Sequence, residues 1–122
     1  MSTPHGSIGF FELGVGDAAA GRAFYGSLLG WGFETGPSGE GWHLTTPGVP
    51  GGMHANDAGG GPYVFFAVDD MDAALARVRE LGGEILPSMG SEETEESIAR
   101  FGRFAFCQDD QGSSFGLHQA PA

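Results

Sequence analysis

Residues 7–31 read SIGFFELGVGDAAAGRAFYGSLLGW, and a second stretch of the same kind follows at residues 63–83, YVFFAVDDMDAALARVRELGG. Each begins with an apolar run and continues into an Ala-rich segment that opens with Asp and ends in Gly. Asp17 aligns with Asp69, which lies 52 residues later, and the closing glycines keep the same spacing. A repeat at this spacing indicates two copies of one supersecondary unit, each of which needs a neighbour to bury its apolar face.

The first copy predicts a strand over residues 7–15 and a helix that follows it. Alternate side chains of a strand point to opposite faces, so we expect Phe11, Leu13 and Val15 to face the helix. Asp17 is a favourable N-cap, and Gly30 is typical of a C-terminal stop. The helix should carry one apolar face, made of Ala20, Ala23, Phe24 and Leu28.

In the rest of the chain, short stretches of sequence separated by Gly and Pro indicate short strands. In the first copy they fall at residues 31–35, 41–46 and near 53–55. The second copy predicts a strand at 63–68, a helix from about 70 to 81, strands at 84–87, 103–107 and 114–118, and an irregular acidic segment at 88–102. Each copy is therefore β-α-β-β-β. We predict one α+β domain over residues 1–122, with modules at 7–56 and 62–119 and a linker at 57–61.

The charge balance narrows the possible partners. Five Lys and Arg residues against 16 Asp and Glu residues give a formal net charge of −11, which repels phosphate backbones and anionic lipids. We therefore expect neither nucleic acid nor membrane as a partner; high solubility and a preference for cationic ligands both remain open. Cys107 is a single cysteine, which excludes an internal disulfide and fits a cytoplasmic location. The sequence has no apolar run long enough for a membrane span.

The order and spacing of several short motifs over residues 7–119 resemble the vicinal oxygen chelate superfamily, the glyoxalase, bleomycin-resistance and dioxygenase group. The residues that carry the resemblance are Asp17, Phe24-Tyr25, Leu29-Gly30-Trp31, Val68-Asp69-Asp70, Leu81-Gly82-Gly83, Gly102-Arg103-Phe104, Asp109-Asp110-Gln111-Gly112 and Phe115-Gly116-Leu117. The resemblance implies two βαβββ modules that form cup-shaped half-barrels. It also implies, for the metalloenzymes of the family, one divalent metal ion held by about four side chains.

The residues at the metal-ligand positions of the family do not suit a metal ion. Carried over by spacing, these positions are Phe10, Tyr63 and Gly116, with a fourth near Gly52 or Met53. Divalent metals need imidazole or carboxylate ligands that converge from several strands. We therefore expect no metal cofactor. The alternative is one divalent ion at a displaced site made of Glu12, His54 and His118, which could equally be three separate polar groups.

The remaining candidates form an aromatic cavity with a few polar groups. The predicted ligand-binding residues are Phe10, Glu12, Trp42, His54, Tyr63, Phe65 and His118; the aromatic ones could instead fill the core. We favour a metal-free protein that binds a flat or hydrophobic molecule, with a cationic group as one option. The alternatives are a lyase, isomerase or oxygenase that uses a metal or a Glu12/His118 acid–base pair, and a dimeric domain without a ligand. A homodimer is expected because short half-barrels leave edges for a twin to cover.

Overall fold

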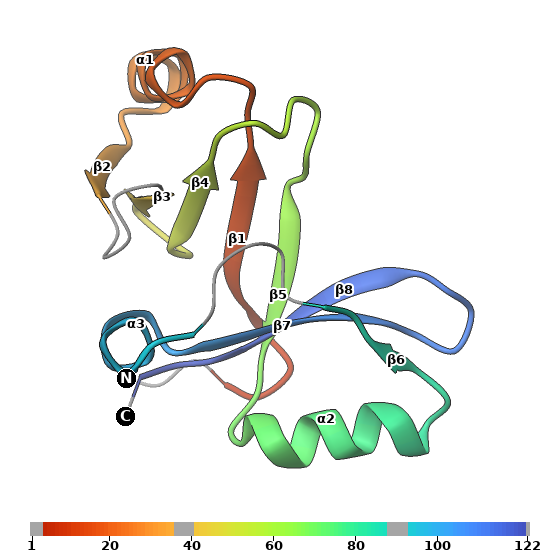
Figure 1. The fold of residues 1–122 in the computed structure, drawn as a ribbon. Coiled ribbons are helices and arrows are strands. Elements are labelled where there is room, and N and C mark those ends of the chain that lie inside the picture. Colours follow the sequence, from red (N-terminus) through yellow and green to blue (C-terminus); the bar gives the residue numbers. More distant parts are fainter. Residues whose placement is uncertain (1–3, 36–40, 88–92, 122) are drawn as a thin grey trace. The chain divides into compact units, whose positions relative to one another are not determined.

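The protein has an α+β fold, described by a computed structural model at residues 4–35, 41–87 and 93–121 (Figure 1). The chain divides into two compact units. One comprises Phe10–Val64, and the other comprises Met1–Gly9 together with Phe65–Ala122. Each unit contains part of the repeated sequence, whereas the predicted module boundaries at 7–56 and 62–119 remain a prediction.

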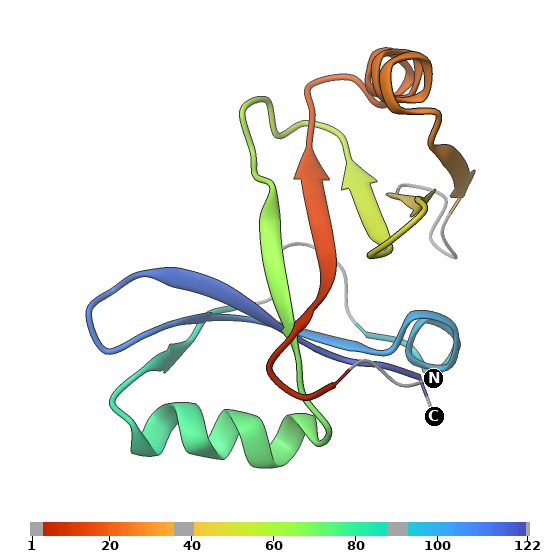
Figure 2. The same cartoon turned by 180° about the vertical axis from the view of Figure 1, so that it is seen from behind.

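The first unit is a small sheet with one helix (Figure 2). Its strands have the order β2-β3-β4-β1, in which β3 is antiparallel to both neighbours and β1 is parallel to β4. Leu13, Leu44 and Met53 are its buried centre, and Phe11, Tyr25 and Trp31 pack around them. The elements are β1 (Ile8–Gly14), α1 (Ala18–Leu29), β2 (Gly32–Thr35), β3 (Gly41–Thr45) and β4 (Gly51–His54).

Helix α1 has the two ends that its sequence predicts. The Asp17 carboxylate accepts a hydrogen bond from the backbone N–H of Ala19 at 2.9 Å. At the other end, Gly30 adopts a left-handed conformation with φ 74°, and its N–H donates to the carbonyl of Gly26. Both caps satisfy backbone groups that a helix end leaves without intrahelical partners.

The face of α1 that packs on the sheet differs from the predicted apolar face. Phe24 and Leu28 are 59% and 64% exposed, and Ala20 and Ala23 are exposed as well. The buried position is Gly21, where an added Cβ would lie 3.0 Å from the sulfur of Met53. The apolar face predicted over Phe24 and Leu28 points to solvent, because the side of the helix that packs on the sheet carries Gly21 and the half-buried Tyr25.

The second unit is a sheet of order β5-β8-β7-β6 with helix α2. Strand β5 is parallel to β8, and the other pairs are antiparallel. Val68, Met71, Cys107 and Leu117 form its buried centre, where burial raises the pKa of the Cys107 thiol. The remaining elements are β5 (Tyr63–Ala67), α2 (Met71–Glu80), β6 (Glu84–Ile85), α3 (Glu95–Phe101), β7 (Arg103–Gln108) and β8 (Ser114–Gln119).

Two details of the second unit differ from the sequence prediction. Asp70 caps α2, so the equivalent of Asp17 is shifted by one position from Asp69. The segment predicted as irregular contains α3, which starts with a capping box between Thr94 and Ser97; residues 88–92 of that segment lie outside the described ranges. No residue of α3 is fully buried, so its sequence lacks the apolar periodicity that reveals longer helices.

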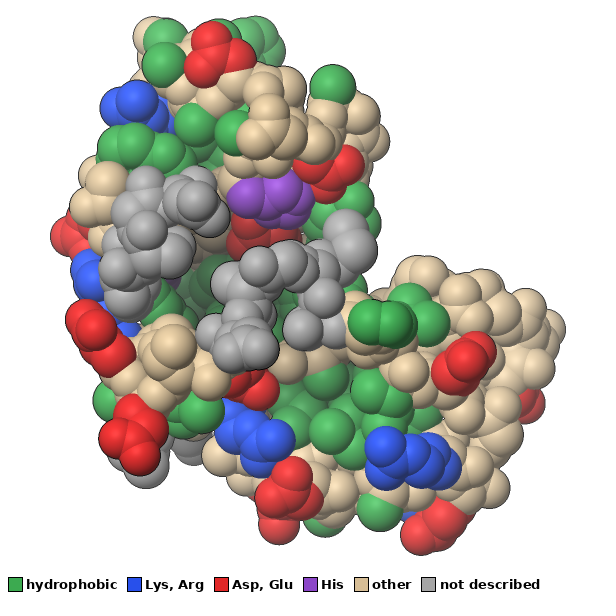
Figure 3. Space-filling view, viewed as in Figure 1, with side chains coloured by type: hydrophobic (Ala, Val, Ile, Leu, Met, Phe, Trp, Pro, Cys, Tyr) green, Lys and Arg blue, Asp and Glu red, His purple; other side chains and the backbone are tan. Residues whose placement is uncertain are grey.

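Acidic side chains outnumber basic ones on the surface. Figure 3 shows Asp and Glu side chains (red) spread over one face, with few Lys and Arg side chains (blue) among them. This distribution agrees with the formal net charge of −11. None of the helices in the described ranges has the length and apolar character of a membrane span.

Candidate functional site

Four polar side chains of the first unit form one hydrogen-bonded cluster. Nδ1 of His54 lies 2.5 Å from Oε2 of Glu12, and Nε2 of His54 lies 2.8 Å from Oδ2 of Asp57. The hydroxyl of Tyr63 donates to the same Asp57 oxygen at 3.0 Å. We call Glu12, His54, Asp57 and Tyr63 the acid–histidine cluster. It contains three of the residues predicted to bind a ligand, namely Glu12, His54 and Tyr63.

The strand register brings Glu12 and His54 to the same face of the sheet. In the parallel pair of β1 and β4, Glu12 lies opposite Gly52 and His54 lies opposite Gly14. The two side chains are therefore two positions apart on adjacent strands, and the period of two places them on one face. Glu12 reaches over Gly52, where no side chain blocks it.

The loop after β4 brings Asp57 back to β1. The backbone N–H of Asp57 donates to the carbonyl of Val15 at 3.0 Å, and the N–H of Gly14 donates to the carbonyl of Gly60 at 2.8 Å. These bonds hold residues 57–60 along the end of the strand. The Asp57 carboxylate can then contact the free side of the His54 ring.

Glycines make the space for both carboxylates. A Cβ added at Gly52 would overlap Oε1 of Glu12, and a Cβ at either Gly14 or Gly60 would overlap Oδ2 of Asp57. Any larger residue would therefore force the carboxylates to move. The geometry of the cluster therefore requires glycine at these three positions.

The geometry favours a positively charged His54. A neutral imidazole has one N–H and could donate to only one of the two carboxylates, whereas an imidazolium donates to both. Desolvation acts to lower the pKa of His54, but the hydrogen bonds to Glu12 and Asp57 and their negative charges outweigh it, and the pKa is raised. Both ring nitrogens are thus occupied by carboxylates.

Glu12 is the buried acid of the cluster. Desolvation raises the pKa of its carboxyl group, and the hydrogen bond and charge of His54 offset only part of that rise. Its side chain keeps 21% of its surface exposed. Oε2 is held by His54, and Oε1 has no hydrogen-bond partner among the described residues.

Asp57 and Tyr63 complete the cluster at its outer side. The hydrogen bond from His54, followed by that from Tyr63, lowers the pKa of Asp57. The same contact with the Asp57 anion raises the pKa of the Tyr63 phenol. Both groups therefore keep the forms in which Tyr63 donates and Asp57 accepts over a wide range around neutral pH.

Asp57 is the member of the cluster that the sequence did not indicate. It falls in the run predicted to be a linker at residues 57–61, where Gly suggests a mobile connection. One sequence feature could have linked Asp57 to His54: Asp57 lies three residues after His54 and is followed directly by small residues. A turn at that place can return a side chain to the histidine.

The structure separates the other predicted ligand-binding residues. Phe10 is 7% exposed, and the tip of its ring lies 3.4 Å from a Cβ placed at Gly52, which puts it beside Glu12. Trp42 pairs with Met53, which pairs with Leu13. Trp42 therefore lies on the face covered by α1, beneath the Arg22 guanidinium at 3.9 Å. The prediction that Trp42 shares the face of Phe10 is wrong.

Phe65 and His118 belong to the second unit and have partners there. Phe65 is 2% exposed and packs edge-on against Phe104 and Phe106. His118 is 7% exposed, and its Nε2 lies 2.7 Å from the carbonyl of Phe101. Desolvation lowers the pKa of His118, with partial compensation by that hydrogen bond. Phe65 thus occupies the position of a core residue.

The residues present do not fit the metal site that the resemblance implies. Within the described residues, no group of three or more His, Cys, Asp and Glu side chains is arranged to hold a metal ion. A Cβ at Gly116 would overlap the ring of Phe65, so that position has no room for a ligand side chain. In the displaced alternative, His54 would have to give up a carboxylate from one ring nitrogen before it could bind a metal.

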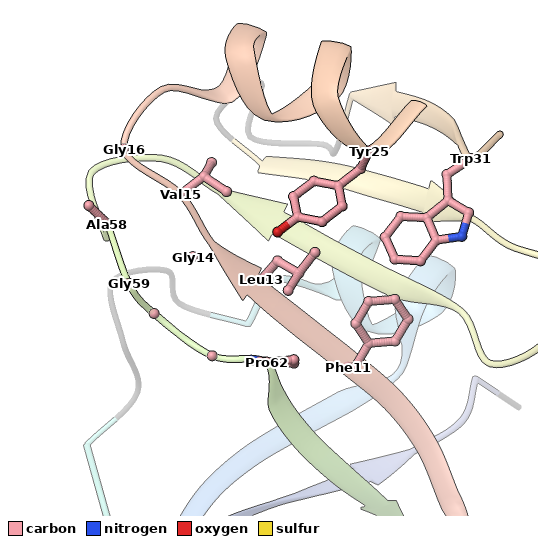
Figure 4. Close-up of a pocket in the computed structure, with 12 residues that line it drawn as sticks. Phe11, Leu13, Gly14, Val15, Gly16, Tyr25, Trp31, Ala58, Gly59 and Pro62 are labelled. Atoms are coloured by element: carbon pink, nitrogen blue, oxygen red, sulfur yellow. The ribbon is translucent and has the colours of Figure 1, made fainter. Parts of the chain in front are cut away.

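A separate cavity of about 540 Å³ lies on the opposite face of β1 (Figure 4). Its walls are Phe11 and Leu13 from β1, Val15 just after that strand, Tyr25 from α1, Trp31 just after the Gly30 cap, and residues 58–62 of the loop. The sequence predicted an aromatic cavity, but from different rings. Phe11 was expected to pack against the helix, and Tyr25 and Trp31 were noted only as parts of motifs.

Comparisons with known proteins agree on the fold family. Residues 7–117 match the Glyoxalase/Bleomycin resistance protein/Dioxygenase superfamily. The chain is 30% identical to "Putative glyoxylase CFP32" of Mycobacterium bovis, over 94% of this chain and 46% of that protein. It is 31% identical to "Anthracycline biosynthesis protein DnrV" of Streptomyces peucetius, over 92% of this chain and 46% of that protein. The chain thus spans about half the length of these relatives.

A solved structure has the same arrangement of elements. Methylmalonyl-CoA epimerase from Mycobacterium tuberculosis superposes with a TM-score of 0.63 over 100% of this chain and 93% of that chain, at 20% sequence identity. At that identity the likeness concerns the fold alone. The match over residues 7–117 confirms the resemblance drawn from the motifs. The chain belongs to the glyoxalase, bleomycin resistance protein and dioxygenase superfamily.

Proposed function

We propose that this protein binds a small organic molecule at the acid–histidine cluster without the help of a metal ion. The observation that carries the proposal is the state of the Glu12 carboxylate. His54 fixes one of its oxygens, while the other has no hydrogen-bond partner among the described residues and the side chain remains partly exposed. A carboxylate held in this way is an oriented acceptor for a ligand.

The chemistry of the cluster favours a ligand with a cationic or N–H donor group. Two carboxylates flank one imidazolium, so the cluster carries a net negative charge when Glu12 is ionised. Partial burial strengthens its interaction with a donor. The half-buried Tyr63 ring, whose plane lies 22° from that of His54, offers apolar surface to a flat body. The formal charge of −11 attracts cations to the protein as a whole.

The metal-free part of the proposal is supported by the donors themselves. Phe10 and Gly116 cannot ligate a metal, and both nitrogens of His54 already have carboxylate partners. Metal binding would need a deprotonated imidazole nitrogen. Two neighbouring anions oppose that deprotonation, because they raise the pKa of His54.

Titration with a planar cation tests the proposal. We would measure binding of 9-aminoacridine by fluorescence in buffer containing EDTA, for the wild type, Glu12→Gln and Glu84→Gln. Glu84 is exposed on β6, so its substitution makes the same charge change away from the cluster. Glu12→Gln should weaken binding at least about tenfold, the equivalent of about 1.4 kcal/mol, whereas Glu84→Gln should leave it within about twofold.

Two results would count against this function. Equal weakening by both variants would mean that the probe responds to overall charge. Near-stoichiometric Zn, Ni, Fe or Mn in protein purified without an affinity tag or chelator, lost in Glu12→Gln, would overturn the metal-free part.

A second candidate is acid–base catalysis by Glu12, favoured by the raised pKa of this carboxyl group. A base with a pKa moved toward neutrality takes up a proton more readily, and the contact with His54 gives the charged forms a partner. A binder returns its ligand unchanged, whereas an enzyme of this kind exchanges a proton. Incubation in D₂O with methylmalonyl-CoA, which is named in the structural neighbour, followed by NMR, distinguishes them. Deuterium incorporation that Glu12→Gln abolishes would favour the enzyme.

A homodimer, formed through α1, belongs to the same proposal. Phe24, Leu28 and Leu29 are 59%, 64% and 49% exposed, which is unusual for a helix of a monomer. Two copies that each carry a formal charge of −11 repel one another, and α1 contains no acidic residue, so it is a surface on which they can meet. The chain spans about half the length of its relatives, and two copies together would have a similar length. We also propose a cytoplasmic location, supported by the single buried thiol.

A further inference from the structure

We propose that the cavity between α1, β1 and the loop at residues 58–62 is a second ligand site, which takes a flat, uncharged aromatic molecule. It lies apart from the acid–histidine cluster, because successive residues of β1 point to opposite faces. Glu12 faces the cluster, while Phe11 and Leu13 face the cavity. This inference does not depend on the function proposed for Glu12.

The size of the cavity suits a small molecule. Its volume of about 540 Å³ falls within the roughly 300–1,000 Å³ typical of ligand pockets. Figure 4 shows Tyr25 extending from the helix toward Leu13, with its hydroxyl on the side away from Trp31, while Trp31 lies near Phe11. The loop at residues 58–62 forms the opposite wall.

The walls select for a flat and neutral ligand. None of the residues that line the cavity carries a charge. The Tyr25 and Trp31 rings lie 5.7 Å apart with planes 14° from parallel, and Phe11 and Trp31 lie 5.5 Å apart. None of the three rings is fully buried, so part of their surface remains available for stacking. The Tyr25 hydroxyl adds one group able to donate a hydrogen bond to the rim of a ligand.

The small residues of the opposite wall explain why the cavity is open. A Cβ added at Gly59 would meet no atom within 4 Å, and a Cβ at Gly16 would meet only the Ala58 methyl, at 3.7 Å. Gly14 and Gly60 cannot gain a side chain without overlapping Asp57, which lies behind them. Gly14 and Gly60 therefore present only backbone to the cavity, and the space inside it comes from the absence of side chains at Gly16 and Gly59.

Binding of 1-aminoanthracene, a planar neutral fluorophore, tests this site. We would follow quenching of tryptophan fluorescence in a Trp42→Phe background, so that Trp31 alone reports. Tyr25→Ala removes one stacking ring and should weaken binding at least about tenfold. Tyr25→Phe keeps the ring and should change it by less than about threefold. Ala58→Phe, at an exposed position on the lip, should block the cavity without removing a core side chain, and it keeps the test valid if Tyr25→Ala does not fold.

Two controls separate this site from other surfaces. Leu28→Ala removes an exposed apolar side chain of the same helix that lies outside the cavity, and Glu12→Gln alters the proposed cation site; both should leave binding within about twofold. Absence of saturable quenching would overturn the proposal. So would equal weakening by Leu28→Ala and Tyr25→Ala, which would place the probe on the exposed face of α1. Loss of 9-aminoacridine binding in Glu12→Gln with 1-aminoanthracene binding intact would show two independent sites.

Discussion

At the scale of single residues, the protonation of His54 is the most accessible test of the acid–histidine cluster. Its two carboxylate partners raise its pKa above the ordinary 6.5, whereas burial lowers that of His118. We expect the two rings to titrate on opposite sides of pH 6.5 in ¹H–¹⁵N NMR spectra, with assignments from His54→Asn. Glu12→Gln removes one anion and should lower the midpoint of His54. An unchanged midpoint would mean that the two side chains are not in contact.

The same shift makes stability depend on pH. The folded protein binds a proton at His54 more tightly than the unfolded chain does, so its stabilisation is complete below pH 6.5 and is lost as the pH rises through the folded pKa. We expect the difference in the free energy of unfolding between the wild type and His54→Asn to shrink over that interval. Urea unfolding at pH 6 and pH 9 measures it, and a difference that grows with pH would contradict the contacts at His54.

Neighbouring glycines of β4 predict two different consequences of the same substitution. In Gly51→Ala the new methyl would lie 2.7 Å from the Phe11 ring, which packs against the core, and overpacking should cost about 1–3 kcal/mol. In Gly52→Ala it meets the end of the Glu12 side chain, which can swing away. We expect a smaller loss of stability in Gly52→Ala, together with a lower pKa of His54. Denaturant unfolding and NMR titration of both variants give the comparison.

The residue scale also shows what the sequence could predict. Glu12 and His54 could be selected because strand parity and the repeat place them near the expected site. Tyr63 was selected as an aromatic wall, yet its hydroxyl is used to hold Asp57. Asp57 was missed because it depends on how the loop returns to β1, which residue spacing does not reveal. Trp42 was misplaced because a one-residue difference in register reverses the face of a strand.

At the scale of elements, the end of α1 can be tested through Gly30. This residue has φ 74°, a conformation that costs residues with a Cβ about 1–2 kcal/mol. Gly30→Ala should therefore destabilise the protein by about that amount, although the added methyl meets no atom within 4 Å. Gly48→Ala is the matched control, since its Cβ also meets open space and its φ is not positive. Equal unfolding free energies for the two variants would argue against the left-handed cap.

Helices α1 and α3 show the limits of pattern reading for elements. The caps of α1 follow from local chemistry and were predicted to the residue. Its buried face was not, since Phe24 and Leu28 repeat at helical spacing but point to solvent. Amphipathic spacing identifies an apolar face without saying what covers it. Helix α3 was not predicted because it begins with a capping box but has no fully buried residue.

At the scale of the whole molecule, the repeat was the strongest signal. The two copies of β-α-β-β-β have Asp at the start and Gly at the end of each helical segment. Together with the other motifs, this pattern predicted the α+β fold and the superfamily that the match over residues 7–117 identifies. Function was less accessible, because Phe10, Tyr63 and Gly116 at the usual metal positions do not form the ligand set that the resemblance implies. One fold can host many activities, so the fold alone does not give the function.

Assembly is the property of the whole molecule that charge controls most directly. If two copies meet through α1, each brings a formal charge of −11 to the complex, and their repulsion extends over about 10 Å at 0.1 M salt. Raising NaCl from 50 to 500 mM should therefore tighten the dimer, because salt screens the repulsion but does not weaken the apolar contact. Sedimentation equilibrium at several protein concentrations measures the dissociation constant at each salt concentration.

Matched variants assign the interface to α1. Leu28 is 64% exposed on α1, and Leu81 is 59% exposed at the end of α2, so Leu28→Lys and Leu81→Lys make the same change in charge and hydrophobicity on two surfaces. Leu28→Lys should weaken the dimer at least tenfold, since it places an ammonium group in an apolar contact. Leu81→Lys should leave the dimer unchanged or slightly tighter, because it reduces the net charge. Equal weakening by the two variants would show that α1 is not the interface. A protein that stays monomeric at every protein and salt concentration would contradict the dimer itself.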